Sequence, residues 1–137
     1  MTKRTEDKVL EIESYLNELG GILPSSFDEY KQSIKTRAAC ERYFEKITES
    51  VTDLAFIIIK ERNLEIPSDE KQAFDVLCEH TIITKEVRTA LKDARGMRNI
   101  IAHQYGKIDD KLVFEAVTSE ISLDVQEFLK QVKKGVR

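Results

Sequence analysis

Apolar residues recur at steps of three and four along most of the chain, the spacing of one face of an α-helix. The first such stretch runs from Val9 to Leu19, and Gly20-Gly21 is predicted to end it. The second runs from Phe27 to about Asn63 without Gly or Pro, which predicts a helix of about 35 residues, near 50 Å long at ~1.5 Å per residue. Its apolar positions include Tyr30, Ile34, Ala38, Ile47, Val51, Leu54 and Ile58.

Serine residues mark the predicted starts of two helices. Ser26 stands three residues before Glu29, which is the spacing of a capping box. After a turn over residues 64–67, Ser68 is placed to cap a third helix that carries Phe74 and Leu77 on its inner side.

The second half of the chain predicts two more helical stretches. One begins near Lys85, and Gly96 predicts a kink or break within it before Gly106 ends it. Asp109 or the residue after it is placed to cap a last helix that extends to about Lys134.

These patterns predict an all-α fold, an antiparallel bundle of four main helices plus a short extra helix. The β-branched run at residues 57–59 lies inside an unbroken helical pattern, so it is not interpreted as a strand. A helix near 50 Å would exceed the length of a four-helix core of this mass. Its apolar stripe indicates either a homodimer or a bent helix.

Composition places the chain among ordinary globular proteins. It has 137 residues, of which 41% are hydrophobic and 34% charged, with 5 Gly and 2 Pro, which excludes collagenous and disordered classes. No apolar run approaches the ~18 residues of a membrane span, and residues 1–7 lack the apolar core of a signal peptide. Cys40 and Cys78 form no metal or disulfide pattern, so we expect reduced thiols in a cytoplasmic protein.

Charge is unevenly distributed. The net charge is −3, yet the segment from Lys85 to Lys107 has six Lys or Arg against Glu86 and Asp93, a local surplus of four positive charges. Such a stretch can hold a phosphate backbone, or it can be a solvated helix face.

Candidate chemistry is confined to one short region. The chain contains neither a phosphate-binding Gly-rich loop nor a metal-ligand spacing, so no metal and no cofactor are predicted. His80 follows a helical stretch and is interpreted as structural. In the basic segment, Asn99 and His103 fall about 40° apart on a helix, so Asn99 can orient the imidazole. Arg98 falls about 140° from His103, so the two meet only through the long arginine side chain or a bent backbone.

Residues 98–109 (RNIIAHQYGKID) resemble the R-N-x-x-x-H-x-Y…I-D signature of HepT-like toxins of the HEPN superfamily. The resemblance extends to residues 42–45, 51–55, 66–67 and 74–77, and covers about 110 residues of the chain. It implies one HEPN-like helical domain over residues 1–137. Residues 93–97 (DARGM) are more basic than the family pattern, and the N-terminal helix is poorly covered.

The resemblance implies the toxin of a type VII-like toxin–antitoxin system, a metal-independent endoribonuclease acting as a homodimer on RNA. His103 would move protons, since histidine ordinarily titrates near pH 6.5, about the pH of the reaction. Arg98 would hold the scissile phosphate, and Asn99 would position His103 or that phosphate. RNA supplies its own nucleophile, the 2′-OH, and the two subunits would contribute acid and base to one site.

The family also implies control by covalent modification. A cognate MntA-like minimal nucleotidyltransferase, the antitoxin, would add AMP to Tyr105 and place negative charge beside Arg98 and His103. Asp53, a carboxylate within an apolar stretch, is a possible supporting residue. It would pair with Arg98 or form a buried salt bridge without a catalytic role.

Two other functions stay open at the level of sequence. The bundle could be a non-catalytic subunit that presents a substrate or nucleotide to a separate nucleotidyltransferase, in which case Arg98 and His103 would bind phosphate without cleavage. It could also be a purely structural dimerising bundle, which would neither bind RNA nor cleave it.

Overall fold

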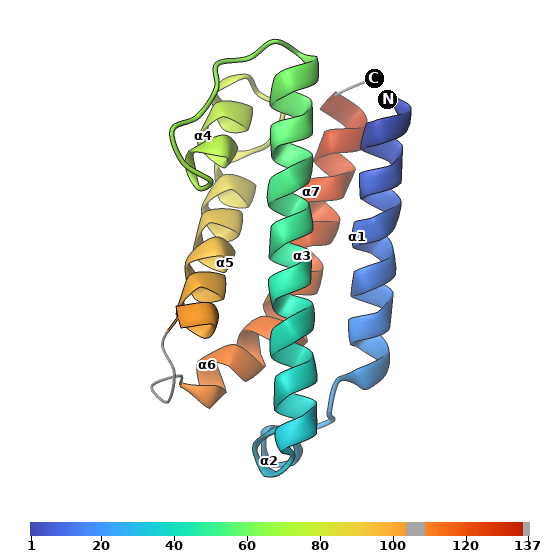
Figure 1. Cartoon of the computed structure of the whole chain (residues 1–137), viewed down its shortest axis with the longest axis vertical. Coiled ribbons are helices and arrows are strands. Elements are labelled where there is room, and N and C mark those ends of the chain that lie inside the picture. The colour runs from blue at the N-terminus through green and yellow to red at the C-terminus, as the bar shows by residue number, and fades with distance from the viewer. Residues whose placement is uncertain (104–108, 136–137) are drawn as a thin grey trace.

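The fold is a helical bundle in which the long helices run along the long axis of the molecule (Figure 1). It comes from a computed structural model that describes residues 1–103 and 109–135. Within those residues every regular element is helical, so the all-α prediction is confirmed. α3 lies in the middle, with α1 on one side and α5 on the other (Figure 1). The four long helices are α1 (Lys3–Ile22), α3 (Ile34–Glu61), α5 (Lys85–His103) and α7 (Ile121–Gly135).

The first helix ends later than predicted. α1 continues through Gly20 and Gly21 to Ile22, and Leu23 is then extended at ψ 132°. A glycine inside a helix costs only about 1 kcal/mol, whereas proline strongly disfavours helical backbone in the residue before it. Pro24 therefore ends α1, and the predicted stop at the glycine pair is wrong.

The predicted helix from Phe27 to Asn63 is two helices. α2 (Phe27–Gln32) and α3 meet at Ser33, whose backbone is extended at φ −115° and ψ 107°. The Ser33 hydroxyl accepts a hydrogen bond from the N–H of Thr36 at 3.1 Å and so caps α3. α3 has 28 residues, about 42 Å at ~1.5 Å per residue, so the prediction of a single helix near 50 Å is wrong.

Two of the predicted caps are tested by the hydrogen bonds. Ser26 caps α2, because its hydroxyl accepts from the N–H of Glu29 at 3.2 Å. Ser68 does not cap α4 (Gln72–Glu79), because its own N–H and hydroxyl donate to the side-chain carbonyl of Gln72. The Asp69 carboxylate accepts from the N–H of Gln72 at 2.8 Å instead.

α5 is one continuous helix through Gly96, so the predicted break there is wrong. A Cβ built on Gly96 would lie 3.3 Å from Nζ of Lys71, in the segment that leads into α4. The glycine therefore provides room for a close approach of this lysine side chain, and the helix keeps its ordinary backbone around it.

The last helical stretch contains a turn that the sequence did not predict. Asp109 caps α6 (Asp110–Glu115) as expected, accepting from the N–H of Lys111 at 3.0 Å. α6 continues into a π-helical turn, η1 (Ala116–Glu120), which leads directly into α7. In α6 the ring of Phe114 lies 5.6 Å from that of Phe27 and 5.5 Å from that of Tyr30.

One apolar core joins these elements. It receives buried side chains from all four long helices and from α2 and α4, which holds the bundle together. Among the described helices, none is long and apolar enough to cross a membrane. The largest contributors include Ile12, Phe44, Leu54, Phe74, Leu77, Leu91 and Phe128.

Candidate active site

The predicted site residues lie on the last turns of α5, at the end nearest to α6 (Figure 1). His103 is exposed and is the last residue of α5, while Asn99 is exposed one turn earlier. Of the two isoleucines between them, Ile101 is buried and Ile100 is 39% exposed. The end of α5 thus presents an amide and an imidazole to solvent.

Arg98 is held by two neighbours. Its Nη2 forms an ion pair with Oε1 of Glu49 from α3, and its Nη1 donates to the amide oxygen of Asn99 at 3.3 Å. The structure therefore joins Asn99 to Arg98, where the sequence indicated His103 as its partner. The Arg98 side chain is 21% exposed, and its Nε is buried without a hydrogen-bond partner within the described residues.

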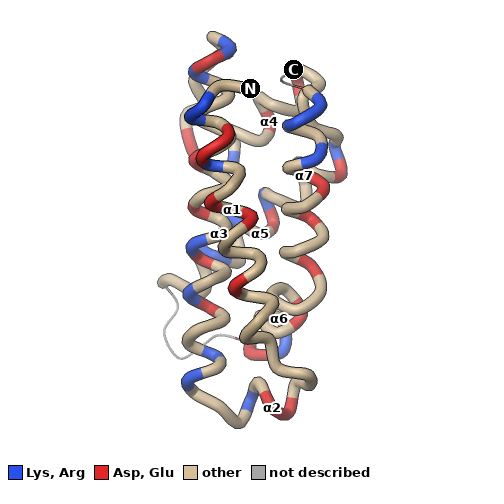
Figure 2. The backbone as a smooth tube through the Cα atoms, turned by 90° about the vertical axis from the view of Figure 1, so that its right-hand side faces the viewer, with Lys and Arg blue, Asp and Glu red and all other residues tan. Residues whose placement is uncertain are grey.

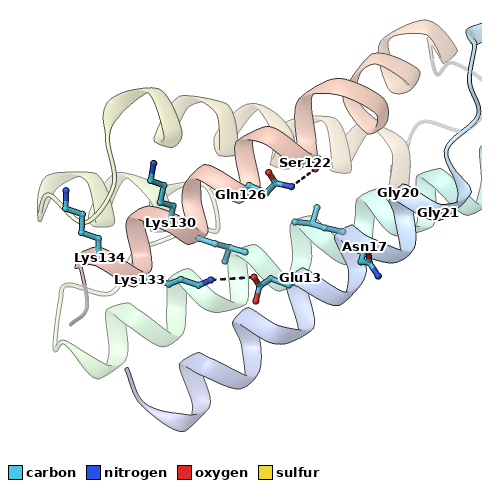
Figure 3. Close-up of a pocket in the computed structure, with 11 residues that line it drawn as sticks. Glu13, Asn17, Gly20, Gly21, Ser122, Gln126, Lys130, Lys133 and Lys134 are labelled. Atoms are coloured by element: carbon cyan, nitrogen blue, oxygen red, sulfur yellow. Dashed lines mark hydrogen bonds and ion pairs between the residues drawn. The ribbon is translucent and has the colours of Figure 1, made fainter.

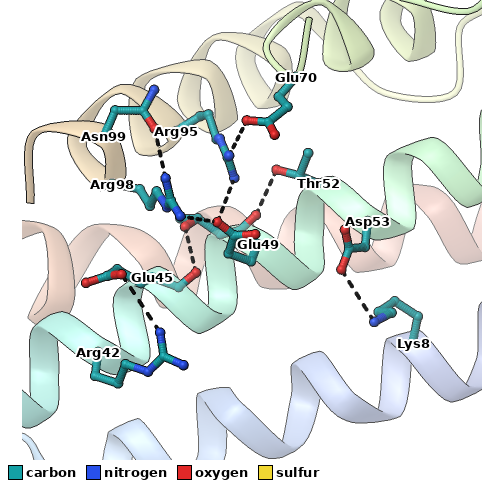
Figure 4. Close-up of polar contacts among 11 residues, drawn as sticks. Lys8, Arg42, Glu45, Glu49, Thr52, Asp53, Glu70, Arg95, Arg98 and Asn99 are labelled. Atoms are coloured by element: carbon teal, nitrogen blue, oxygen red, sulfur yellow. Dashed lines mark hydrogen bonds and ion pairs between the residues drawn. The ribbon is translucent and has the colours of Figure 1, made fainter. Parts of the chain in front are cut away.

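A second arginine lies beside Arg98, and sequence reasoning missed its role. Arg95 is only 4% exposed, and its Nη2 forms an ion pair with Glu70, just before α4. Its Nη1 lies 3.6 Å from Oε1 of Glu49, the same oxygen that Arg98 contacts (Figure 4). The available signal was spacing, because Arg95 follows the buried Leu91 by four residues and so falls on the inner face of α5.

Asp53 is not part of this cluster. Its carboxylate faces α1, where it lies 3.7 Å from Nζ of Lys8, and its side chain is 59% exposed (Figure 4). The predicted pairing with Arg98 is wrong, and so is the alternative of a buried salt bridge, because this ion pair is at the surface. Glu49, one turn earlier on α3, takes the place at Arg98 that the sequence suggested for Asp53.

In the folded chain, much of the positive charge of the basic segment is paired with carboxylates. Nζ of Lys92 lies 2.9 Å and Nε of Arg88 lies 3.9 Å from the carboxylate of Asp75 in α4. With the pairs of Arg95 and Arg98, four of the cations in this segment face carboxylates supplied by other elements. Acidic and basic residues are likewise interspersed along the other helices (Figure 2). An anion that binds Arg98 must therefore compete with a carboxylate.

The other candidate groups have structural surroundings. His80 ends α4, and its Nε2 lies 2.9 Å from Oε2 of Glu65. The pKa of the Glu65 carboxyl is lowered by its own backbone N–H and by His80. Cys40 and Cys78 are free thiols, and burial raises the pKa of the Cys40 thiol. Residues 1–103 and 109–135 contain no group of His, Cys, Asp and Glu side chains that could hold a metal ion.

Tyr105, the predicted site of modification, lies outside the described residues. A groove of about 1100 Å³ is present elsewhere, between α1 and α7 (Figure 3). Glu13 and Lys133 meet across it, 3.5 Å apart. No residue of α5 lines this groove, so it is separate from Arg98 and His103.

Comparisons with known proteins identify a relationship over nearly the whole chain. The profile of the family described as Ribonuclease HepT-like matches residues 12–132. The mRNA nuclease HepT of Shewanella oneidensis is 25% identical over 105 residues, which are 77% of this chain and 78% of that protein. The tRNA nuclease HepT of Aphanizomenon flos-aquae is 28% identical over 104 residues, 76% of this chain and 71% of that protein.

The fold is also found in a solved complex. The tri-AMPylated HEPN toxin of Shewanella oneidensis, in complex with the MNT antitoxin, superposes with a TM-score of 0.90 and 22% sequence identity. The match covers 98% of this chain and 99% of the toxin. At this identity the likeness shows a shared arrangement of helices.

Proposed function

The chain belongs to the ribonuclease HepT-like family, and on that premise we propose that it is a metal-independent endoribonuclease. The observation that carries the proposal is the presence of a partly exposed arginine, Arg98, and an exposed histidine, His103, on the last two turns of one helix. These are the two side-chain types that RNA transesterification requires, one to hold the phosphate and one to move protons. The names of the relatives, mRNA nuclease and tRNA nuclease, support RNA as the substrate.

The reaction uses the nucleophile that RNA itself carries. The 2′-oxygen forms a bond to the adjacent phosphorus while the bond from phosphorus to the 5′-oxygen breaks. One proton leaves the 2′-OH and one reaches the departing 5′-oxygen, so the products are a 2′,3′-cyclic phosphate and a 5′-OH. His103 transfers a proton, and Arg98 stabilises the charge on the pentacoordinate phosphorus with its guanidinium. Asn99 keeps the Arg98 guanidinium oriented through the hydrogen bond described above.

The single-chain geometry favours a homodimer as the active unit. Arg98 turns inward to Glu49, whereas His103 is exposed at the helix end, and one imidazole cannot act simultaneously as base and acid. Two copies that face each other through the ends of α5 would bring two histidines to one phosphate. The proposed site is therefore shared, with each subunit contributing one Arg98 and one His103.

The same relationship supports a role as the toxin of a toxin–antitoxin pair in the cytoplasm. The similar Shewanella toxin is AMPylated and bound to an MNT antitoxin. For this chain the corresponding control is addition of AMP to Tyr105 by a cognate minimal nucleotidyltransferase. Tyr105 follows His103 by two residues in the sequence, and an attached AMP would add negative charge that competes with an RNA phosphate for Arg98.

The test is cleavage of RNA by the purified protein in excess EDTA, with analysis of the product ends. We expect cleavage to persist and to yield 2′,3′-cyclic phosphates. His103→Ala should lower turnover by about 10²-fold or more and leave RNA affinity nearly unchanged. His80→Ala is the matched control and should cleave at the parental rate, because His80 pairs with Glu65 and precedes the start of α5, whereas His103 is at the end of that helix.

Two results would contradict the proposal. Loss of activity in EDTA that Mg²⁺ restores would mean a metal-dependent reaction. RNA binding by every variant with cleavage by none would instead indicate the non-catalytic binding subunit. For the control step, intact mass after co-expression with the nucleotidyltransferase should rise in the parental protein and stay unchanged in Tyr105→Phe.

A further inference from the structure

Two arginines of α5 share one carboxylate oxygen, and only one of them belongs to the family motif. Oε1 of Glu49 contacts Nη2 of Arg98 and lies 3.6 Å from Nη1 of Arg95. We propose that Glu49 occupies the phosphate position on Arg98 until RNA arrives, and that Arg95 retains Glu49 when RNA displaces it. The inference rests on the proposed function and assigns Glu49 and Arg95 as positioning residues for Arg98.

The first step concerns what Glu49 stands in for. Carboxylate and phosphate oxygens bind the guanidinium fork in the same geometry. Glu49 thus holds Arg98 in one orientation while no substrate is present, which reduces the conformational entropy that Arg98 loses on binding RNA. The same contact opposes binding, because a phosphate oxygen must replace Oε1 of Glu49 before it can use Nη2.

The second step concerns Arg95, which has N–H groups that can still form hydrogen bonds. It is 4% exposed, and within the described residues its Nε and Nη1 make no hydrogen bond. Nη1 is the atom that lies 3.6 Å from Glu49, which is beyond the usual N–H···O distance of about 2.9 Å. A movement of Glu49 by less than about 1 Å would close this gap and form a charge-assisted hydrogen bond.

The third step concerns charge when RNA is bound. Displacement by RNA leaves the carboxylate of Glu49 without Arg98, and because this side chain is 44% exposed the resulting electrostatic penalty on RNA binding is modest. Arg95 removes that penalty, because it is anchored by Glu70 and cannot follow Arg98 toward the RNA. When RNA binds, Glu49 therefore loses its contact with Arg98 and pairs with Arg95 alone. The Arg98 guanidinium is then free to bind the phosphate.

The test compares three variants in the His103→Ala background, in which bound RNA is not consumed. Glu49→Gln keeps the shape of the side chain and removes its charge. Arg95→Gln removes the reserve partner. The matched control is Asp75→Asn, since Asp75 is likewise shared by two cations of α5 but faces Arg88 and Lys92.

Two measurements are made on each variant. The first is the rate at which an arginine-selective dicarbonyl reagent modifies Arg98, followed by peptide mass mapping without RNA. The second is the dissociation constant for a short RNA. Glu49→Gln should modify faster and bind RNA about fivefold more tightly, whereas Arg95→Gln should modify more slowly and bind about fivefold more weakly. Asp75→Asn should change neither.

The double variant decides how Arg95 acts. With Glu49→Gln already present, Arg95→Gln should have no further effect, because Arg95 acts through Glu49. An equal loss of affinity in both backgrounds would overturn the proposal, as would unchanged Arg98 reactivity in Glu49→Gln. If Arg95→Gln does not fold, Arg95→Lys replaces it, with a smaller shift in the same direction. Because the reagent arm contains no RNA, its outcome is independent of whether the protein is a ribonuclease.

Discussion

α5 carries two clusters built on the same plan, in which two cations share one carboxylate from a neighbouring element. In the first, Asp75 lies between Arg88 and Lys92, and the three side chains are 30%, 33% and 34% exposed. In the second, Glu49 lies between Arg95 and Arg98, which are 5% and 21% exposed, while Glu49 itself is 44% exposed. The clusters differ in how deeply the cations are buried.

That difference separates a structural contact from a candidate functional one. All members of the Asp75 cluster are solvated to a similar degree, so its ion pairs are weak surface interactions. In the Glu49 cluster one arginine, Arg95, is buried and forms an ion pair with Glu70, and the other, Arg98, is partly exposed. The sharing of a carboxylate is therefore uninformative on its own, and the unequal burial of the two arginines identifies the site.

The largest expected effect comes from removing the partly open arginine. Arg98→Ala should lower kcat/KM for RNA by about 10²–10³-fold, because it removes phosphate binding and charge stabilisation together. Arg88→Ala in the other cluster should stay within about twofold of the parental protein. Cleavage assays with end-labelled RNA measure both. Equal losses in the two variants would mean that α5 binds RNA through general positive charge.

A smaller effect is expected from removing the acidic partner of each cluster, measured as thermal and denaturant stability. Glu70→Gln removes the negative charge that faces the buried Arg95 and leaves a neutral amide in its place, so we expect a loss of about 2 kcal/mol. Asp75→Asn should lose less than about 1 kcal/mol, because its partners remain solvated. Losses of the same size would contradict the difference in burial.

Gly96 lies between Arg95 and Met97, and its replacement tests whether the Glu49 cluster needs backbone flexibility. Gly96→Ala should stabilise the protein by about 0.5–1 kcal/mol, since the helix is continuous there and the nearest atom to a new Cβ is the flexible end of Lys71. RNA cleavage should be unchanged. Reduced cleavage with increased stability would indicate that α5 bends during the reaction.

The smallest effect concerns two carboxylates of like charge, Asp93 on α5 and Asp124 on α7. Burial and Asp93 on α5 raise the pKa of Asp124 above its ordinary value of 3.8. The folded state therefore holds this proton more tightly, and the ionised group destabilises the fold at neutral pH. Asp124→Asn should stabilise by less than about 1 kcal/mol at pH 7. In denaturant titrations this difference should shrink as the pH falls through the raised folded-state pKa and should disappear below the ordinary value of 3.8, where the parental carboxyl is protonated in both states.

Apolar periodicity was sufficient to locate the four long helices, because their buried stripes dominate the local pattern. It failed at three places where a different interaction decides. Ser33 interrupts the α2–α3 stretch through a hydrogen bond to Thr36, Pro24 overrides the glycine pair, and Gly96 accommodates Lys71 without a break. None of these interactions alters the spacing of apolar residues, so spacing could not reveal them.

The candidate site was predicted only as far as it is contiguous in sequence. Arg98, Asn99 and His103 follow one another on a single helix and carry the family signature. Glu49 and Glu70 come from other elements, and their position beside α5 depends on how the helices pack. The sequence contained Asp53 and Glu49 one turn apart on α3, and only the packing of α1 and α5 against that helix distinguishes them.

The π turn at Ala116–Glu120 absorbs one extra residue where α6 passes into α7. A π turn holds about one residue more than an α turn, so its five residues turn the chain by nearly the angle of four residues of regular α-helix. If the same five residues formed regular helix, α6 would rotate against α7 by up to about 100°, and Phe114 would move away from the rings of Phe27 and Tyr30 although no core side chain had been lost. The contact between α6 and α2 thus depends on the backbone geometry of this turn as well as on the apolar side chains.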